Sequence, residues 1–275
     1  MYEIVDKKTL NEAVTALTVK APYVANKAKA GQFVIIRTDE KGERIPLTVS
    51  DFDAAAGTVT IVVQAVGLTT KKLSKMEKGD FIADVVGPLG MPTEFGEPKK
   101  AIIIGGGVGC AIAYPQAKAL YNMGVDVTVI AGFRSKDIVI LEDEMRAVSR
   151  KLYITTDDGS YGEKGLVTDV LKRLLESGGY DLVIAIGPVI MMKFVALTTK
   201  PYGVRTVVSL NPIMIDGTGM CGGCRVKVGG ETKFACVDGP DFDGHLVDFD
   251  ELMRRNTLFR EEEAHACRLE GKSNG

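Results

Sequence analysis

Residues 103–109 read Ile-Ile-Gly-Gly-Gly-Val-Gly, and they join the apolar run Ala101–Ile104 to the helical pattern Cys110–Asn122. A glycine turn between a strand and a helix leaves backbone N–H groups exposed at the positive end of the helix, which favours a phosphate group. The stretch departs from the standard dinucleotide fingerprint, because Cys110 stands where a third glycine or an alanine is expected. A purely structural turn is the alternative, and the position on the first strand of a sheet favours nucleotide binding.

Downstream of this turn, apolar runs alternate with helical patterns as far as residue 211, which predicts a doubly wound parallel sheet over residues 99–211. The strands are expected at Ala101–Ile104, Val125–Ala131, Leu152–Thr155, Asp181–Ile186 and Thr206–Leu210, and the helices at Cys110–Asn122, Leu141–Ser149, Leu166–Ser177 and Met191–Thr199.

Three more of the predicted strands end in glycine-bearing turns. They are Ala131-Gly132-Phe133-Arg134, Thr156-Asp157-Asp158-Gly159-Ser160 and Ile186-Gly187-Pro188. Each alone is typical of a plain turn. Ligands bind at the carboxyl ends of parallel strands, so four such ends on one edge of one sheet predict a binding crevice.

Upstream, residues 1–98 carry short strand patterns at Ala13–Lys20, Gln32–Arg37 and Thr58–Val66, separated by glycines. This rhythm predicts a small antiparallel barrel. Two stretches in it could bind a cofactor, namely 44–50 (Arg-Ile-Pro-Leu-Thr-Val-Ser) and 66–70 (Val-Gly-Leu-Thr-Thr). An arginine can pair with a pyrophosphate. On the residues alone, an ordinary β-bend with a surface arginine is the favoured interpretation.

Beyond residue 212 the sequence becomes a glycine-rich cysteine loop, followed by one amphipathic helix expected at Leu246–Phe259. The loop 216–224 reads Asp-Gly-Thr-Gly-Met-Cys-Gly-Gly-Cys, and Cys236 follows it. Three clustered cysteines among glycines predict a metal or iron–sulfur site. A structural zinc site completed by His245 is the rival metal interpretation. The isolated Cys110 and Cys267 are expected to be packing or incidental residues.

Composition excludes several classes of protein. The 275 residues contain 34 Lys and Arg against 36 Asp and Glu, so no net basic charge attracts nucleic acid or an anionic membrane. The N-terminal residues 1–8 lack the apolar core of a signal peptide, so a cytoplasmic protein is expected. The longest apolar run, Ala101–Pro115, is interrupted by glycines and is too short to span a bilayer.

The order of these motifs resembles the ferredoxin–NADP reductase superfamily. The resemblance rests on Arg-x-Pro-Leu-Thr at 44–48, Gly-Gly-Gly-Val-Gly at 105–109, Gly-Pro-x-x-Met-Met at 187–192 and Cys-x-Asp-Gly-Pro at 236–240. Within the superfamily the chain is similar to the electron-transfer subunits of dihydroorotate dehydrogenase B. It is more similar to the small subunits of NADH-dependent reduced ferredoxin:NADP oxidoreductases, a sulfide dehydrogenase-like group of electron-bifurcating flavoenzymes.

The resemblance implies FAD between barrel and sheet, NAD(H) on the sheet and a 2Fe-2S cluster in a C-terminal lobe at 212–275. By position, the FAD residues would be Arg44, Pro46, Leu47, Thr48, Val62, Gln64, Gly67, Thr69 and Thr70. The nucleotide crevice would be lined by Gly105, Gly106, Gly107, Val108, Gly109, Arg134, Asp157, Asp158, Gly187 and Met191. No catalytic acid, base or nucleophile is expected, because the cofactors carry the chemistry.

The cysteine loop departs from the dihydroorotate dehydrogenase pattern, Cys-x4-Cys-x2-Cys followed by a fourth Cys. Asp216 occupies the first position with the spacing preserved. The expected cluster ligands are therefore Asp216, Cys221, Cys224 and Cys236, with a carboxylate replacing one thiolate. A loop-capping aspartate is the alternative role for Asp216.

The resemblance also implies an obligatory partner, a larger iron–sulfur flavoprotein subunit that handles ferredoxin and NADP(H) while this chain serves NAD(H). Arg134 argues against NAD(H), since an arginine at the end of the second strand often signals a 2′-phosphate. Two alternative functions stay open. One is the electron-transfer subunit of an NAD-dependent dihydroorotate dehydrogenase, and the other is a zinc-stabilised nucleotide-binding module without redox chemistry.

Overall fold

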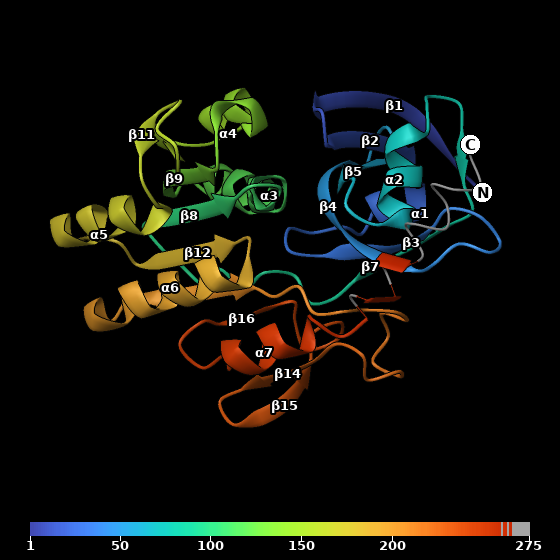
Figure 1. Cartoon of the computed structure of the whole chain (residues 1–275). Coiled ribbons are helices and arrows are strands. Elements are labelled where there is room, and N and C mark those ends of the chain that lie inside the picture. Colours follow the sequence, from blue (N-terminus) through green and yellow to red (C-terminus); the bar gives the residue numbers. More distant parts are fainter. Residues whose placement is uncertain (260, 263, 266–275) are drawn as a thin grey trace.

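A computed structural model describes residues 1–259, 261–262 and 264–265. Figure 1 shows a barrel at one side, a layered α/β unit beside it and a small lobe that contacts both. Cys267 lies outside the described residues. In the part of the chain that is described, no helix has the length and apolar character needed to cross a membrane.

The N-terminal unit is the expected antiparallel barrel. Its sheet has the order β6-β1-β2-β5-β4-β3-β7. The strands are β1 (Tyr2–Asn11), β2 (Val14–Lys20), β3 (Phe33–Arg37), β4 (Ile45–Asp53), β5 (Thr58–Gln64), β6 (Phe81–Ile82) and β7 (Asp84–Leu89). Only Ala83 separates β6 from β7, so the two edges of the sheet meet and the barrel nearly closes. Leu17, Ile36 and Ile61 point inward, as the alternation of apolar residues predicts.

Parts of the barrel differ from the sequence-based expectation. The polar strand β1 was not expected, nor was the helix α2 (Leu68–Lys75). A shorter helix, α1 (Pro22–Ala25), follows β2. Residues 87–89 belong to the end of β7. Strand β1 alternates poorly because most of its residues are exposed or half-buried, and its register with β2 shifts twice.

The second unit is the doubly wound sheet, with the order β11-β10-β9-β8-β12-β13-β16. The strands are β8 (Lys100–Gly106), β9 (Asp126–Phe133), β10 (Lys151–Thr156), β11 (Glu163–Lys164), β12 (Leu182–Ile186), β13 (Arg205–Ser209) and β16 (Asp241–Asp243). The pairs from β11 to β13 are all parallel. From β8 the strand order first runs outward to β9, β10 and β11, and the chain then returns to place β12 on the other side of β8. The point between β8 and β12 is the switch point at which such sheets bind ligands.

Helices cover both faces of this sheet. One face packs against α3 (Gly109–Asn122) and α4 (Glu142–Ala147), with Ile103, Val129 and Ile184 in the shared core. The other packs against α5 (Val167–Ser177) and α6 (Val189–Thr199), with Ile102, Ile104 and Val183. Alternate side chains of each buried strand therefore point to opposite faces of the sheet and pack in two separate cores, as a sheet covered on both faces requires. Two 3-10 turns, η1 (Lys136–Ile138) and η2 (Lys200–Tyr202), complete the unit.

The C-terminal lobe is joined to the sheet. It consists of the cysteine loop, the hairpin of β14 (Arg225–Val228) and β15 (Glu231–Phe234), and α7 (Phe249–Arg255). Strand β16 comes from the same segment, yet it pairs antiparallel with β13 and forms the edge of the α/β sheet. Helix α7 is shorter than the expected 246–259, because Asp248 caps its first turn through the N–H of Glu251.

Candidate functional site

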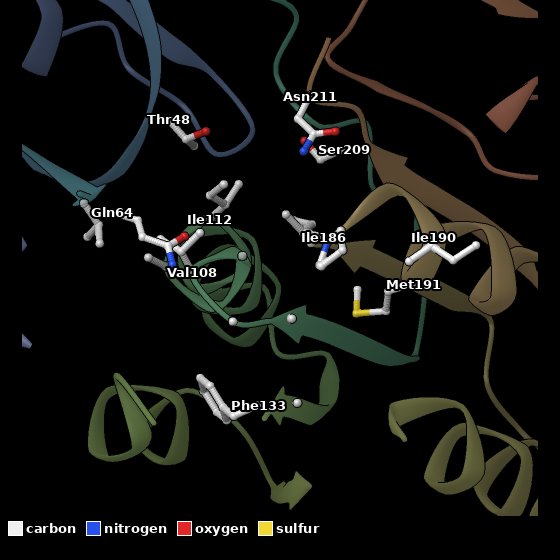
Figure 2. Close-up of a pocket in the computed structure, with 18 of the residues that line it drawn as sticks. Thr48, Gln64, Val108, Ile112, Phe133, Ile186, Ile190, Met191, Ser209 and Asn211 are labelled. Carbon is white, nitrogen blue, oxygen red and sulfur yellow. The ribbon is translucent and has the colours of Figure 1, made fainter. Parts of the chain in front are cut away.

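A cavity of about 1200 Å³ lies between the barrel and the carboxyl edge of the sheet. Figure 2 shows side chains entering it from β4, β5, α3, β9, α6 and the end of β13. Pockets for drug-sized ligands usually measure about 300–1,000 Å³. This cavity therefore has room for a dinucleotide-sized cofactor together with part of a second ligand.

The barrel contributes most of the residues predicted to hold FAD. Those that line the cavity are Pro46, Leu47, Thr48, Val62, Gln64 and Thr70. Gly67 and Thr69 are beside the cavity without lining it. The hydroxyl of Thr69 is buried and donates to the Glu43 carboxylate at 2.7 Å. The Thr70 hydroxyl closes the first turn of α2, accepting from the N–H of Gly67 at 2.9 Å.

The glycine turn after β8 supplies the sheet side of the cavity through Gly106, Gly107, Val108 and Gly109. No side chain caps the N-terminus of α3, so its first-turn N–H groups are free of side-chain acceptors and suit an anionic group. Gly109 must be glycine, because a Cβ there would lie 2.4 Å from the carbonyl oxygen of Ile186. Helix α3 therefore packs directly on β12 at the switch point.

Gly105 sits behind the cavity. A Cβ on Gly105 would lie 2.7 Å from both Cα and Sγ of Cys110. The close packing of helix on strand thus depends on Gly105, which explains how a cysteine is accommodated where the standard fingerprint has glycine or alanine. Cys110 is fully buried and burial raises the pKa of its thiol to about 12, in keeping with a packing role.

At the other strand ends, some of the predicted nucleotide residues line the cavity and one does not. Arg134, Asp157, Gly187 and Met191 line the cavity. Asp158 does not, because its carboxylate turns back to accept from the N–H and hydroxyl of Ser160, at 2.9 and 2.6 Å. These two bonds lower the pKa of Asp158. Asp157 and Arg134 thus bring a negative and a positive side chain to the same rim.

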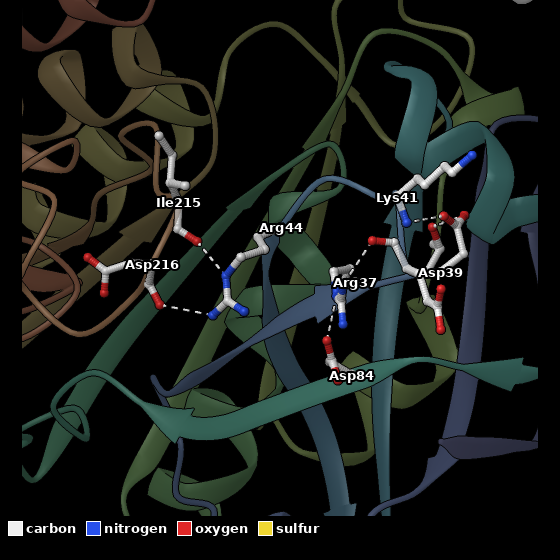
Figure 3. A network of polar contacts seen from close by, with 9 residues as sticks. Arg37, Asp39, Lys41, Arg44, Asp84, Ile215 and Asp216 are labelled. Atoms are coloured by element: carbon white, nitrogen blue, oxygen red, sulfur yellow. Dashed lines mark hydrogen bonds and ion pairs between the residues drawn. The ribbon is translucent and has the colours of Figure 1, made fainter.

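Arg44 contacts the backbone of the cysteine loop, which its sequence context did not indicate. Its guanidinium donates to the carbonyl oxygens of Ile215 and Asp216, at 3.1 and 3.3 Å, and it is not among the residues lining the cavity (Figure 3). An arginine of the barrel thus contacts the cysteine loop, about 170 residues away in sequence. Its predicted role at FAD stays a prediction.

Many lining residues were not singled out from the sequence. They include Phe33, Ser50, Ile112, Phe133, Thr155, Leu166, Thr168, Ile190, Phe194, Ser209, Asn211, Met214 and Pro240. Phe133 and Ile190 adjoin predicted residues, and Ser209 ends a predicted strand, so the rule of carboxyl strand ends could have found these three. Ser50 ends the predicted cofactor stretch 44–50, and it donates to the carbonyl of Ala111 where the barrel packs on α3. Phe33 carries no sequence signal, since its place at the cavity depends on how the units pack together.

The four predicted cluster ligands lie in the C-terminal lobe as two contacting pairs. The Sγ atoms of Cys224 and Cys236 lie 3.2 Å apart and both residues are buried, whereas Cys221 is exposed. Asp216 is next to Cys221, whose N–H donates to its Oδ2 at 2.8 Å. Bonds from Thr218 and Cys221 hold the pKa of Asp216 far below its usual value. Burial and the neighbouring Cys224 raise the pKa of Cys236 to about 12.

This donor set fits a two-iron cluster better than a single ion. Among the described residues, no three or more His, Cys, Asp or Glu side chains gather at distances that suit one metal ion. A 2Fe-2S cluster needs two pairs of ligands, one for each iron. Cys224 with Cys236 and Asp216 with Cys221 would be these pairs, and the ligand assignment stays a prediction. His245, the candidate zinc ligand, instead shares a hydrogen bond of 2.9 Å with Thr199.

Barrel, doubly wound sheet, shared cavity and cysteine loop together define a reductase of the ferredoxin reductase type with an added iron–sulfur lobe. Comparison with known proteins agrees. Residues 211–248 match the family model described as the iron–sulfur cluster binding domain of dihydroorotate dehydrogenase B.

The most informative relatives are similar over nearly the full chain. A homologue of the dihydroorotate dehydrogenase B (NAD(+)) electron transfer subunit from Thermotoga maritima is 51% identical, covering 96% of this chain and 93% of its own. The electron transfer subunit from Geobacillus thermodenitrificans is 36% identical over 87% and 94%. A solved chain of NADH-dependent reduced ferredoxin-NADP oxidoreductase, described in connection with flavin-based electron bifurcation, is 49% identical with a TM-score of 0.93 over 98% and 97%. The chain belongs to the family of dihydroorotate dehydrogenase B electron transfer subunits and their homologues, which are oxidoreductase subunits.

Proposed function

We propose that this chain passes electrons between NAD(H), FAD and a 2Fe-2S cluster as the small subunit of an electron-bifurcating NADH-dependent reduced ferredoxin:NADP oxidoreductase. The observation that carries the proposal is the position of β4. This strand lines the cavity through Pro46, Leu47 and Thr48, and two residues earlier Arg44 contacts the cysteine loop. The strand that would hold the two-electron carrier is thus joined directly to the residue that contacts the loop of the one-electron carrier.

Bound FAD would accept or deliver a hydride at the nicotinamide and exchange single electrons with the cluster. The residues of this chain supply position. Thr48 and Gln64 face the cavity from the barrel, and the N-terminus of α3 faces it from the sheet (Figure 2). The apolar side chains of Phe33, Ile112 and Met214 would exclude water from the flavin.

The one-electron carrier needs an acceptor outside this chain. Three apolar side chains of the lobe are exposed near the exposed Cys221, namely Ile215, Met220 and Val237, with Met220 the most exposed at 89%. An exposed apolar group of this kind is typical of a protein interface. We place a larger iron–sulfur flavoprotein subunit there, which would handle ferredoxin and NADP(H), and we expect the assembly in the cytoplasm.

Two measurements on the purified chain test the proposal. The visible spectrum is expected to combine flavin and iron–sulfur absorption, with about one FAD and two irons per chain. Cys236→Ser is expected to lose the iron–sulfur part and keep the flavin. A colourless protein that carries zinc would overturn the redox function in favour of a nucleotide-binding module.

A second candidate is the electron-transfer subunit of a dihydroorotate dehydrogenase, favoured by the match of residues 211–248. Asp216 argues against it, since the resembling subunits carry cysteine at that position. Purification from the native host with its partner separates the two. Recovery with a flavoprotein that oxidises dihydroorotate would replace the first proposal by the second.

A further inference from the structure

The cysteine loop is held by side chains. Residues 211–223 form no helix or strand, and within the described chain no backbone–backbone hydrogen bond involves them. Three glycines of the loop, Gly217, Gly219 and Gly222, have positive φ angles of 66–88°. The backbone of the loop is therefore tightly folded without the hydrogen bonds of a helix or sheet. Something other than secondary structure must fix the ligands that this segment carries.

Three arginines bind the carbonyl oxygens of this loop. Besides Arg44 at Ile215 and Asp216, Arg225 donates to the carbonyl of Gly222 at 2.7 Å, and Arg255 donates to that of Gly223 at 3.2 Å. The three come from separate elements, the segment before β4, strand β14 and helix α7. Charged donors make stronger hydrogen bonds than neutral ones, so these contacts are well suited to hold a loop that lacks regular backbone hydrogen bonds.

Backbone N–H groups in and near the loop point toward the predicted ligands. Cys221 donates to Asp216 Oδ2 at 2.8 Å, Gly223 to Cys221 Sγ at 3.4 Å, and Cys236 to Cys224 Sγ at 3.4 Å. In Figure 3 the carbonyl of Asp216 faces Arg44, while its carboxylate points away from it. In the Gly222–Gly223 peptide both ends are engaged, because Arg225 binds the carbonyl oxygen of Gly222 while the N–H of Gly223 donates to Cys221 Sγ.

We propose that Arg44, Arg225 and Arg255 form an arginine clamp of positioning residues for the cluster site, an inference that rests on the proposed function. Each guanidinium fixes a carbonyl of the loop and thereby holds the backbone that carries Asp216 and Cys221, and Arg225 also keeps the N–H of Gly223 directed at Cys221 Sγ. Their three positive charges also favour the reduced cluster, which carries one more negative charge than the oxidised one. Hydrogen bonds and charges around the sulfurs are the protein's means of setting the potential of such a cluster.

The clamp gives Arg44 a role different from the FAD contact that its sequence motif implies. Two backbone carbonyls occupy its guanidinium, and the residue lies outside the cavity lining. Under the clamp, Arg44→Gln keeps FAD and weakens the hold on iron. Under the FAD assignment, the same variant loses FAD and leaves the cluster unchanged.

The test uses the full chain loaded with flavin and iron, carrying Arg44→Gln, Arg225→Gln and Arg255→Gln singly and together. Arg254→Gln is the matched control, because Arg254 is the exposed neighbour of Arg255 on α7. Three quantities are measured: the rate of iron loss to a chelator, the electron paramagnetic resonance signature of the reduced cluster, and the cluster's midpoint potential. Thermal unfolding and FAD content show whether each variant is folded.

The triple variant is expected to lose iron roughly tenfold faster than wild type, the usual scale for outer-shell partners of a metal site. Its midpoint potential is expected to fall and its resonance signature to change, while Arg254→Gln matches wild type. Lysine at the three positions keeps the charge and loses the fork of donors, so it is expected to restore most of the potential and little of the iron retention.

Two outcomes overturn the inference while the proposed function stands. One is a folded triple variant with wild-type iron retention, signature and potential. The other is Arg44→Gln that loses FAD alone. If the triple variant does not fold, the same three quantities are compared in the single glutamine variants and in the variants with lysine at the three positions, and they decide whether the clamp holds the cluster. A wild-type chain that binds no cluster would overturn the proposed function and the clamp together.

Discussion

The sulfur atoms of Cys224 and Cys236 lie 3.2 Å apart, although the two residues are separated by 12 positions in the chain. A disulfide would bring them to about 2.05 Å. Two thiolates about 2.3 Å from one tetrahedral metal ion would lie roughly 3.8 Å apart, so a small opening of the pair admits an iron. We expect Cys224→Ser and Cys236→Ser to lower bound iron to a small fraction of the wild-type content. Iron analysis checks this, with Cys110→Ser as the control that keeps its iron.

The ligand role of Asp216 is tested by Asp216→Cys. A soft thiolate then replaces a hard, protonatable carboxylate at the same spacing. The 2Fe-2S cluster is expected to persist, with a changed visible spectrum and a shifted midpoint potential, both measured on the purified chain. Asp216 would lose its place as a ligand if neither quantity changed, and the capping of Thr218 and Cys221 would then be its whole function.

Sequence and structure agree most where a local pattern has a local cause. The strand–glycine–helix turn at 103–109 and the sheet helices were predictable because apolar periodicity reports the buried face of each element. Arg44 was not, since its contacts at Ile215 and Asp216 depend on how the lobe docks on the barrel. The sequence likewise predicts that Asp158 binds the nucleotide beside Asp157. Its hydrogen bonds with Ser160, which only the structure shows, turn its carboxylate away from the cavity.

Gly109→Ala tests the switch point. The new methyl carbon would stand 2.4 Å from the carbonyl oxygen of Ile186, so α3 must move off β12. We expect a loss of about 1–3 kcal/mol in stability, which is typical of overpacking, and weaker nucleotide binding. Thermal unfolding and nucleotide titration measure the two effects. Gly67→Ala is the steric control, because its methyl would have only Thr70 Oγ1 within 4 Å, at 3.9 Å. Equal unfolding temperatures for the two variants would contradict the close approach.

Asp241 should make stability depend on pH. Its carboxyl group is enclosed where the lobe meets the α/β unit, accepting from Thr93 at 2.6 Å and Gln116 at 3.0 Å, and its Oδ1 has no partner among the described residues. Burial raises its pKa to about 6 from 3.8. The folded protein thus favours the protonated form. The resulting stability is fully present below the unfolded pKa and is lost as pH rises through about 6.

Asp241→Asn removes this titration while keeping the shape of the side chain. Between pH 5 and pH 8 the stability of wild type relative to the variant is expected to fall by about 1 kcal/mol, or roughly 2–4 °C in the unfolding midpoint. Midpoints of both proteins across this range measure the difference, in which the titration of all other groups cancels. A difference that stays constant with pH would show that the carboxyl group is not protonated in the folded protein.

We expect the choice between NAD(H) and NADP(H) to depend on Asp157 and Arg134, which both line the cavity. A carboxylate repels a 2′-phosphate and can accept from a ribose hydroxyl, whereas an arginine favours the phosphate. We expect NADH to reduce the bound flavin faster than NADPH, with the carboxylate outweighing the exposed arginine. Asp157→Asn is expected to narrow that preference by roughly tenfold, the equivalent of 1.4 kcal/mol, chiefly by improving NADPH. Asp158→Asn is the matched control, since its carboxylate is held by Ser160 and does not line the cavity. Stopped-flow reduction of the flavin by each nucleotide measures the ratio, and a wild-type preference for NADPH would assign the rim to Arg134.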